Sequence, residues 1–174
     1  MNLPKITLVL GGAASGKSAH AEALILGSLK TPVYLATAQI RDAEMAAKVA
    51  AHRDQRGPGW RTVEEPLDLP AALAGVSLGE AVLIDCATLW LTNLMLADAD
   101  LGLAETGLWA ALERCAAPVV IVSNEVGMGI VPDNALARRF RNAQGRLNQR
   151  LAARAGLAVL VVAGLPLVLK GRWP

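Results

Sequence analysis

The sequence is poor in cysteine and in aromatic residues. Its 174 residues include only two cysteines, Cys86 and Cys115, and only 3% are Phe, Trp or Tyr. Two cysteines make neither a disulfide framework nor a cysteine-rich metal site, so a cytoplasmic, reducing compartment is expected. The scarcity of aromatic residues means that the core has to be built from Ala, Leu, Val and Ile, which contribute most of the 53% hydrophobic content.

The sequence also lacks a large excess of one charge and a long apolar run. With 17 basic and 15 acidic residues the formal net charge is +2, which favours neither a nucleic-acid partner nor a membrane surface. The uncharged stretch 155–169 is shorter than the roughly 20 residues of a membrane-spanning helix and contains Gly156, Gly164 and Pro166. We expect buried strands there, no membrane span, and no signal peptide at the N-terminus.

What the sequence does contain is a regular alternation of strand-like and helix-like segments. This pattern predicts one α/β domain, residues 1–174, with a three-layer arrangement around a mostly parallel sheet. The predicted strands are Ile6–Leu10, Val33–Ala36, Ala81–Asp85, Val119–Ser123, Ala158–Val162 and Leu165–Lys170. The predicted helices are Lys17–Leu29, Asp42–Arg56, Pro70–Ala74, Thr88–Leu96, Leu103–Cys115 and Asn134–Arg154.

A phosphate-binding loop is the strongest motif. It fits G-x-x-x-x-G-K-[ST] and lies between a predicted strand and a predicted helix. Backbone N–H groups of such a loop point at phosphate oxygens, and the N-terminus of the following helix adds partial positive charge. Lys17 is expected to reach the β- and γ-phosphates and Ser18 to bind Mg²⁺. The residues of the loop are Gly11, Gly12, Ala13, Ala14, Ser15, Gly16, Lys17 and Ser18.

An acidic residue at the end of a neighbouring strand usually completes the magnesium site of such proteins. Asp85 follows the apolar run Val82-Leu83-Ile84 and is the candidate. The alternative is that Asp85 caps the helix that begins near Thr88. The sequence has no D-x-x-G at this strand and no N-K-x-D, so a GTPase switch is not favoured.

The chain has two histidines, and they have different expected roles. His20 lies on the helix after the phosphate loop and is expected to be an ordinary helix-face residue. His52 lies among charged residues near the end of the Asp42–Arg56 helix, where a solvated side chain is the plain interpretation. As a nucleophile, its neutral ring would attack an α-phosphorus, with Arg53 and Arg56 stabilising the phosphate charge.

Two further features lie in the C-terminal half. The glycine-rich connection 124–133 follows an apolar strand, and in parallel α/β sheets such loops line the ligand crevice. Arg139, Arg146 and Arg150 share one face of the helix Asn134–Arg154, which predicts either a solvated basic face or an anion site.

Several motifs together resemble a known family. They are the phosphate loop, Glu44-Met45 followed by His52, Trp60 with Glu64, Asp85-Cys86 with Thr92-Asn93-Leu94, the segment Ser123–Pro132, and Gly145–Gln149. These residues resemble the bifunctional adenosylcobinamide kinase/adenosylcobinamide-phosphate guanylyltransferases of cobalamin biosynthesis. The resemblance runs from about Ile6 to Lys170, and its specific part is Ser123–Pro132 combined with the His52 region.

This resemblance implies a RecA-like P-loop NTPase fold, a homotrimer and two reactions. ATP or GTP would phosphorylate adenosylcobinamide, and GTP would then guanylylate adenosylcobinamide-phosphate through a GMP-histidine intermediate. His52 falls on the position of the guanylylated histidine, which reverses the interpretation from spacing alone. The implied nucleotide contacts beyond the phosphate loop are Ala36, Thr37, Ala38, Arg53, Asp54, Gln55, Arg56, Glu64 and Asp85.

Three positions depart from the family pattern. Ala14 stands where Arg is common, Ala51 precedes His52 where a second His is common, and Asn142 stands where Asp is usual. Two alternatives to the bifunctional enzyme remain. A monofunctional small-molecule P-loop kinase would need only Lys17, Ser18 and Asp85, and a nucleotide-dependent binding module would bind nucleotide without turnover.

Overall fold

The computed structural model describes residues 1–40 and 42–174, and for Glu44, Met45, Lys48 and Gln55 it describes the backbone only. The strands are β1 (Ile6–Gly11), β2 (Thr31–Ala36), β3 (Arg61–Glu64), β4 (Glu80–Asp85), β5 (Val119–Asn124), β6 (Leu157–Val162) and β7 (Leu165–Lys170). The helices are α1 (Lys17–Gly27), α2 (Ala43–Arg56), α3 (Leu69–Ala74), α4 (Ala87–Leu96), α5 (Leu101–Arg114) and α6 (Ala135–Arg154).

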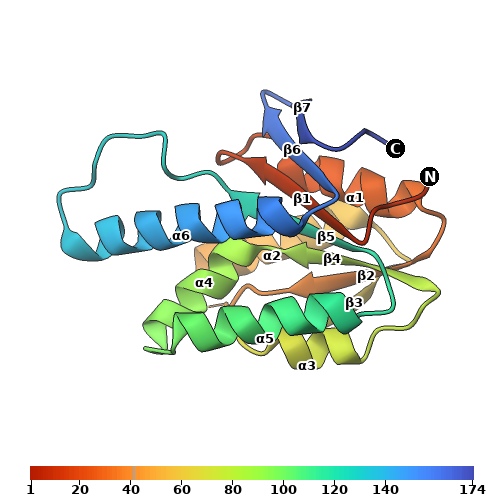
Figure 1. Cartoon of the computed structure of the whole chain (residues 1–174), viewed down its shortest axis with the longest axis horizontal. Coiled ribbons are helices and arrows are strands. Elements are labelled where there is room, and N and C mark those ends of the chain that lie inside the picture. The colour runs from red at the N-terminus through yellow and green to blue at the C-terminus, as the bar shows by residue number, and fades with distance from the viewer. Residues whose placement is uncertain (41) are drawn as a thin grey trace.

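All the strands belong to one seven-stranded sheet with the order β3-β2-β4-β5-β1-β6-β7 (Figure 1). Six strands run parallel, and β7 pairs antiparallel with β6 at one edge. The register pairs Ala36 of β2 with Asp85 of β4 and Gly11 of β1 with Asn124 of β5. Because these strands are parallel, their carboxyl ends meet at the same edge of the sheet.

The sheet is covered by helices on both faces, which explains why its central strands are apolar on both sides. Helix α1 packs on one face with Val9, Leu83 and Val122. Helices α3, α4, α5 and α6 cover the other face (Figure 1). The predicted three-layer arrangement around a mostly parallel sheet is confirmed.

Three helices begin at polar residues that cap their free N–H groups. Asp68 accepts from the Ala71 N–H, Asp100 from the Leu103 N–H, and Asn134 from the Ala137 N–H. Each bond pairs an N–H that has no partner inside its helix. These caps determine where α3, α5 and α6 start.

The predicted elements agree with the observed ones except at two strands. The short edge strand β3 was not predicted, because Arg61-Thr62-Val63-Glu64 has no apolar run and gains its strand conformation by pairing with β2. The expectation of buried strands over 155–169 was wrong for β7, whose six residues are all exposed. As the edge strand of a hairpin, β7 pairs with β6 on one side, and its side chains are not covered by any described helix.

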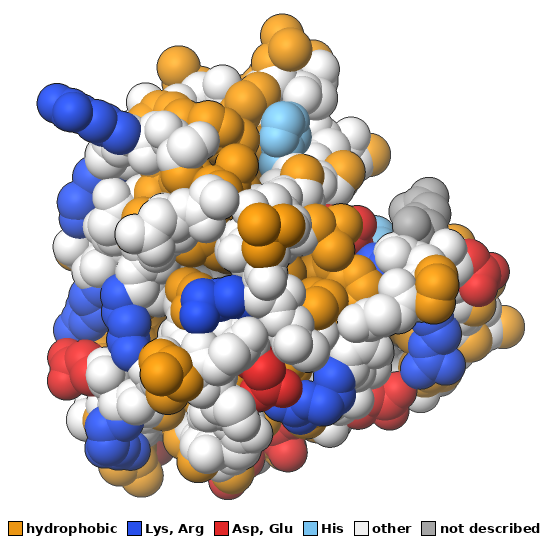
Figure 2. All heavy atoms as spheres, turned by 90° about the vertical axis from the view of Figure 1, so that its right-hand side faces the viewer, with side chains coloured by type: hydrophobic (Ala, Val, Ile, Leu, Met, Phe, Trp, Pro, Cys, Tyr) orange, Lys and Arg blue, Asp and Glu red, His pale blue; other side chains and the backbone are white. Residues whose placement is uncertain are grey.

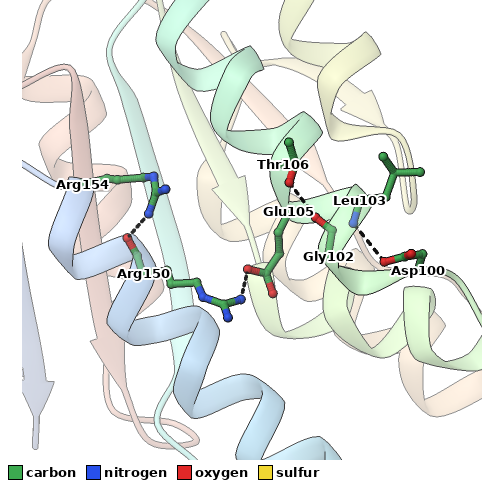
Figure 3. A network of polar contacts seen from close by, with 7 residues as sticks. All are labelled: Asp100, Gly102, Leu103, Glu105, Thr106, Arg150 and Arg154. Atoms are coloured by element: carbon green, nitrogen blue, oxygen red, sulfur yellow. Dashed lines mark hydrogen bonds and ion pairs between the residues drawn. The ribbon is translucent and has the colours of Figure 1, made fainter.

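An ion pair joins α5 to α6 (Figure 3). Arg150 of α6 donates to the carboxylate of Glu105, a residue of α5 that is only 7% exposed. One turn later the Arg154 guanidinium carbon lies 4.3 Å from the centroid of the Trp109 ring. Arg150 therefore stabilises the packing of two helices, whereas Arg139 and Arg146 remain an exposed basic pair on α6.

One face of the molecule carries both signs of charge: Figure 2 shows basic, acidic and hydrophobic side chains interspersed over it. None of the helices in the described part of the chain has the length and apolar character of a membrane span.

We expect Arg150→Ala to lower the free energy of unfolding by about 2 kcal/mol, because the buried Glu105 carboxylate loses its charged partner. Urea unfolding measures this change. Arg146→Ala, one turn earlier on the exposed side of α6, is the matched control and should change stability by no more than about 0.5 kcal/mol. Equal effects of the two substitutions would show that the ion pair contributes nothing.

Candidate functional site

The phosphate loop connects β1 to α1 and is packed against two other parts of the sheet. The Glu125 N–H donates to the Gly11 carbonyl at 3.0 Å, and the Gly164 N–H, in the β6–β7 turn, donates to the Ser15 carbonyl at 2.9 Å. A Cβ on Gly11 would lie 2.8 Å from the carbonyl oxygen of Val161 on β6, and Gly16 has a φ of +90°. Gly11 is therefore required by the close approach of β6, and Gly16 by its left-handed backbone conformation.

A pocket of about 580 Å³ opens beside this loop. It lies among the start of α1, the carboxyl ends of β2, β3 and β4, and the C-terminal half of α2. It brings together nine of the eighteen site residues expected from the sequence. These are Lys17, Ser18, Ala36, Ala38, His52, Arg53, Arg56, Glu64 and Asp85.

Asp85 does not cap α4, because Cys86 is the N-cap residue of that helix and makes no side-chain capping bond. The Asp85 carboxylate instead accepts a hydrogen bond from the Tyr34 hydroxyl, with 3.2 Å between Oη and Oδ2. Ser18 and Asp85 both line the pocket. A hydroxyl and a carboxylate are hard oxygen donors of the kind that Mg²⁺ prefers.

These two donors fit the magnesium expectation in kind. Among the described residues, no group of three or more His, Cys, Asp or Glu could hold a metal ion by itself. A divalent cation between Ser18 and Asp85 would therefore take its remaining oxygen ligands from nucleotide phosphates and water, as Mg²⁺ does in P-loop proteins.

Helix α2 contributes His52, Arg53 and Arg56 to the pocket wall. His52 and Arg53 are exposed, and Arg53 Nη2 lies 3.6 Å from Glu64 Oε1 at the end of β3. Both members of this pair are more than half exposed, so the pair adds little to stability. The pair does, however, place the part of α2 that carries His52 next to the end of β3.

An aromatic and cationic cluster lies below this helix. The Arg56 guanidinium carbon is 3.3 Å from the centroid of the Tyr34 ring. The Trp60 ring meets Tyr34 edge-on at 6.2 Å. Burial, reinforced by the charge of Asp85, raises the pKa of Tyr34 above its ordinary range, although Arg56 opposes the rise. The hydroxyl therefore keeps its proton at neutral pH.

Two other titratable groups have a shifted pKa near the pocket. Burial raises the pKa of the Cys86 thiol to about 11, so this pocket residue keeps its proton at neutral pH. Burial is also the main cause of the raised pKa of Glu22, on α1. Arg56 opposes that rise, Asp85 adds to it, and His52 opposes it.

Thr37 has a structural position. Its side chain is fully buried; Oγ1 donates to the Cys86 carbonyl and accepts from the Cys86 N–H, both at 2.8 Å. Asn93 Nδ2 donates to the Thr37 carbonyl at 2.8 Å. The Thr37 hydroxyl thus connects the ends of β2 and β4. Thr37 does not line the pocket, whereas its neighbours Ala36 and Ala38 do.

The other expected contacts lie elsewhere. Gly12, Ala13 and Ala14 are exposed in the phosphate loop, and Asp54 is exposed on α2 outside the pocket lining. The Gln55 side chain lies outside the described residues. His20 is outside the pocket as well; its Nε2 lies 2.8 Å from the Gly164 carbonyl oxygen, and its ring meets Trp173 edge-on. The ordinary role expected for His20 agrees with this position.

Sequence reasoning did not single out Tyr34 or Glu22, and it named Asn124 only as part of a loop. No local pattern marks Tyr34, because a tyrosine in an apolar strand is typical of a core. Asn124 lines the pocket and its carbonyl accepts from Asn148 Nδ2 at 3.0 Å. A buried network of Ser123, Gln144 and Asn148 holds this strand end. The sequence signal for this network was the presence of the polar residues Gln144 and Asn148 on the apolar face of α6.

Comparisons with known proteins show that nearly the whole chain is similar to the family that the sequence motifs resemble. The family model described as cobinamide kinase / cobinamide phosphate guanyltransferase matches residues 7–169. The bifunctional adenosylcobalamin biosynthesis proteins CobU of Salmonella typhimurium and of Escherichia coli are each 46% identical over 179 residues, covering 94% of this chain and 98% of theirs. The protein CobP of Pseudomonas aeruginosa is 45% identical over 167 residues, with 94% and 96% covered.

Solved structures share the fold at much lower identity. An ATPase of a bacterial type III secretion system has a TM-score of 0.56 at 13% identity, covering 92% of this chain and 52% of its own. The flagellar accessory protein FlaH from Methanocaldococcus jannaschii has a TM-score of 0.51 at 10% identity, with 98% and 80% covered. The expected α/β fold is confirmed, and both of these proteins share it.

We expect Thr37→Val to lower the free energy of unfolding by about 2 kcal/mol, because the buried N–H and carbonyl of Cys86 both lose their partner. Thr37→Ser keeps the hydroxyl and is the matched control, with an expected loss of about 1 kcal/mol or less. Urea unfolding of the two variants tests this. A valine variant as stable as the serine variant would contradict the bracing role.

Proposed function

Because the chain belongs to the cobinamide kinase / cobinamide phosphate guanyltransferase family, we propose that its one phosphate-loop pocket carries both reactions. The observation behind this proposal is that Lys17, Ser18 and Asp85 share the pocket with His52. A monofunctional kinase would use the first three residues and leave His52 without a task. The relatives are bifunctional adenosylcobalamin biosynthesis proteins, which favours the two-reaction enzyme.

In the kinase reaction, the hydroxyl of adenosylcobinamide attacks the γ-phosphorus of ATP or GTP. The bond between the γ-phosphorus and the β,γ-bridging oxygen breaks, the hydroxyl proton is released, and a nucleoside diphosphate leaves. Lys17 and the backbone N–H groups of residues 12–17 stabilise negative charge on the phosphates. Lys17 Nζ lies 3.0 Å from the Gly12 carbonyl, so this ammonium is already held over the loop.

In the guanylyl transfer, a neutral ring nitrogen of His52 attacks the α-phosphorus of GTP and pyrophosphate leaves. A phosphate oxygen of adenosylcobinamide-phosphate then attacks the same phosphorus, giving adenosylcobinamide-GDP and free His52. Arg53 and Arg56 flank His52 on α2 and are suited to neutralise the phosphates. The γ- and α-phosphorus cannot occupy one position, so we expect the α2 segment to shift between the two steps.

Ser18 and Asp85 would hold Mg²⁺, which supplies charge neutralisation on the phosphates when it is bound. Ala36, Ala38 and Glu64 complete the nucleotide wall at the ends of β2 and β3. We propose that the chain acts as one nucleotide-binding domain in the cytoplasm. Its free, buried cysteines are compatible with a reducing compartment.

We further propose that the working unit is a homotrimer, as the family resemblance implies. The leucines of β7, Leu165, Leu167 and Leu169, are 72%, 58% and 54% exposed. Assembly of subunits would cover such an apolar surface.

Incubation with Mg²⁺ and GTP radiolabelled at the α-phosphate should label the protein through an acid-labile, base-stable bond, as expected for a phosphoramidate. His52→Ala should abolish the label while circular dichroism stays unchanged. His20→Ala is the matched control, because His20 is the other histidine and lies outside the pocket, and it should keep the label. Label that persists in His52→Ala would exclude His52 as the nucleophile, and an unlabelled wild-type protein would favour the monofunctional kinase.

Sedimentation equilibrium at micromolar concentration should give a mass of three times the 18.2 kDa of the chain. A single species with the mass of one chain would contradict the trimer and would require each pocket to bind its corrinoid alone.

A further inference from the structure

Tyr34 touches two charged groups of the pocket at once. Its hydroxyl oxygen lies 3.2 Å from Asp85 Oδ2, and its ring centroid lies 3.3 Å from the guanidinium carbon of Arg56. The side chain is only 8% exposed, so it is fixed by packing. One rigid ring therefore separates a carboxylate expected to bind metal from a cation expected to bind phosphate.

The position of Tyr34 follows from strand register. Tyr34 pairs with Leu83 of β4, and Ala36 pairs with Asp85. Residues two apart on a strand point to the same face, so the Tyr34 side chain extends along that face toward the carboxyl edge and reaches Asp85 with its hydroxyl. The remainder of the ring contacts the layer that contains α1, together with Trp60.

Arg56 lies on the ring with its flat face. The N–H donors of a guanidinium lie in its plane, so a face stacked on a ring leaves those donors pointing sideways. Arg56 Nε is buried and has no hydrogen-bond partner among the described residues. Arg56 also lines the pocket. The arrangement is that of a cation held against an aromatic ring in the pocket wall, with a buried Nε–H that no described residue pairs.

Resting on the function proposed above, we propose that Tyr34 is a positioning residue for the nucleotide: its hydroxyl orients Asp85 toward Mg²⁺, and its ring holds Arg56 against the triphosphate. The two contacts are made by different parts of one side chain and can be separated by substitution. A plain core role for Tyr34 would predict that loss of the hydroxyl alone has no effect on ligand binding.

The hydroxyl contact is tested with Tyr34→Phe, which keeps the ring. Equilibrium dialysis measures the affinity of GTP carrying a methylene group between the α- and β-phosphates, in Mg²⁺ and in EDTA. This analogue cannot be cleaved at the α–β bond, and no corrinoid is present to accept its γ-phosphoryl group, so only binding is measured. We expect the gain in affinity on adding Mg²⁺ to fall about tenfold, while the affinity in EDTA is unchanged. Wild-type behaviour of Tyr34→Phe in Mg²⁺ would overturn the hydroxyl role.

The matched control is Thr106→Val. It also removes one hydroxyl, which donates to the Gly102 carbonyl on the exposed side of α5. Its affinity should match the wild type in both Mg²⁺ and EDTA. A loss of the Mg²⁺ effect in this control would show that the assay responds to hydroxyl removal in general and would overturn the interpretation of Tyr34→Phe.

The ring contact is tested in EDTA with Tyr34→Leu and Arg56→Gln. Tyr34→Leu should weaken metal-free binding by about fivefold relative to Tyr34→Phe, because Arg56 loses its support. The double variant should bind no more weakly than Arg56→Gln alone, since the ring acts through Arg56. Additive losses, or a leucine variant equal to Tyr34→Phe, would overturn the ring role. Tyr34→Met fills more of the site and repeats the comparison should leucine prevent folding.

These outcomes are independent of the guanylylation experiment. Absence of a covalent adduct on the wild-type protein would contradict the proposed function, whereas the dialysis measurements involve no transfer and still decide the role of Tyr34. Conversely, an adduct on the wild type together with unchanged binding by Tyr34→Phe and Tyr34→Leu would retain the proposed function and overturn only this inference.

Discussion

Parallel pairing of the central strands is the constraint on which the site depends. Because β1, β2, β4 and β5 run in the same direction, their carboxyl ends lie along one edge of the sheet. Lys17 and Ser18 follow β1, Asp85 ends β4, and Asn124 ends β5. These residues are far apart in the chain, and only the common direction of the strands places them around one pocket. If one central strand ran in the opposite direction, the residue at its carboxyl end would lie at the other edge of the sheet, away from the pocket.

Buried polar networks hold the pocket edge. Thr37 and Asn93 secure the ends of β2 and β4, and Ser123 with Asn148 secures the end of β5. Buried polar groups that are paired in this way impose one geometry, because any shift would leave a donor or acceptor without a partner in a region of low dielectric. The P-loop and Asp85 are thus kept in position before any ligand arrives.

Helix α2 differs from this edge, because it is polar and mostly exposed. Among its described side chains, Arg53 pairs with the exposed Glu64 and Arg56 lies over the ring of Tyr34. His52, the proposed nucleophile, lies on this helix, whereas Lys17, Ser18 and Asp85 lie at the sheet edge. This separation is consistent with the proposal that one pocket carries two reactions.

The sequence by itself determined the phosphate loop, the α/β class and the acidic strand end at Asp85, because these depend on local spacing and on strands that are apolar on both faces. The resemblance, carried by several separated motifs, identified the family and selected His52 over His20. Only the tertiary structure decided that β3 pairs at one edge, that β7 is an exposed strand, that Thr37 braces Cys86, and that Tyr34 contacts both Asp85 and Arg56. Each of these features depends on contacts between residues that are distant in the sequence. Strand register and helix packing determine such contacts, and they cannot be predicted from local composition.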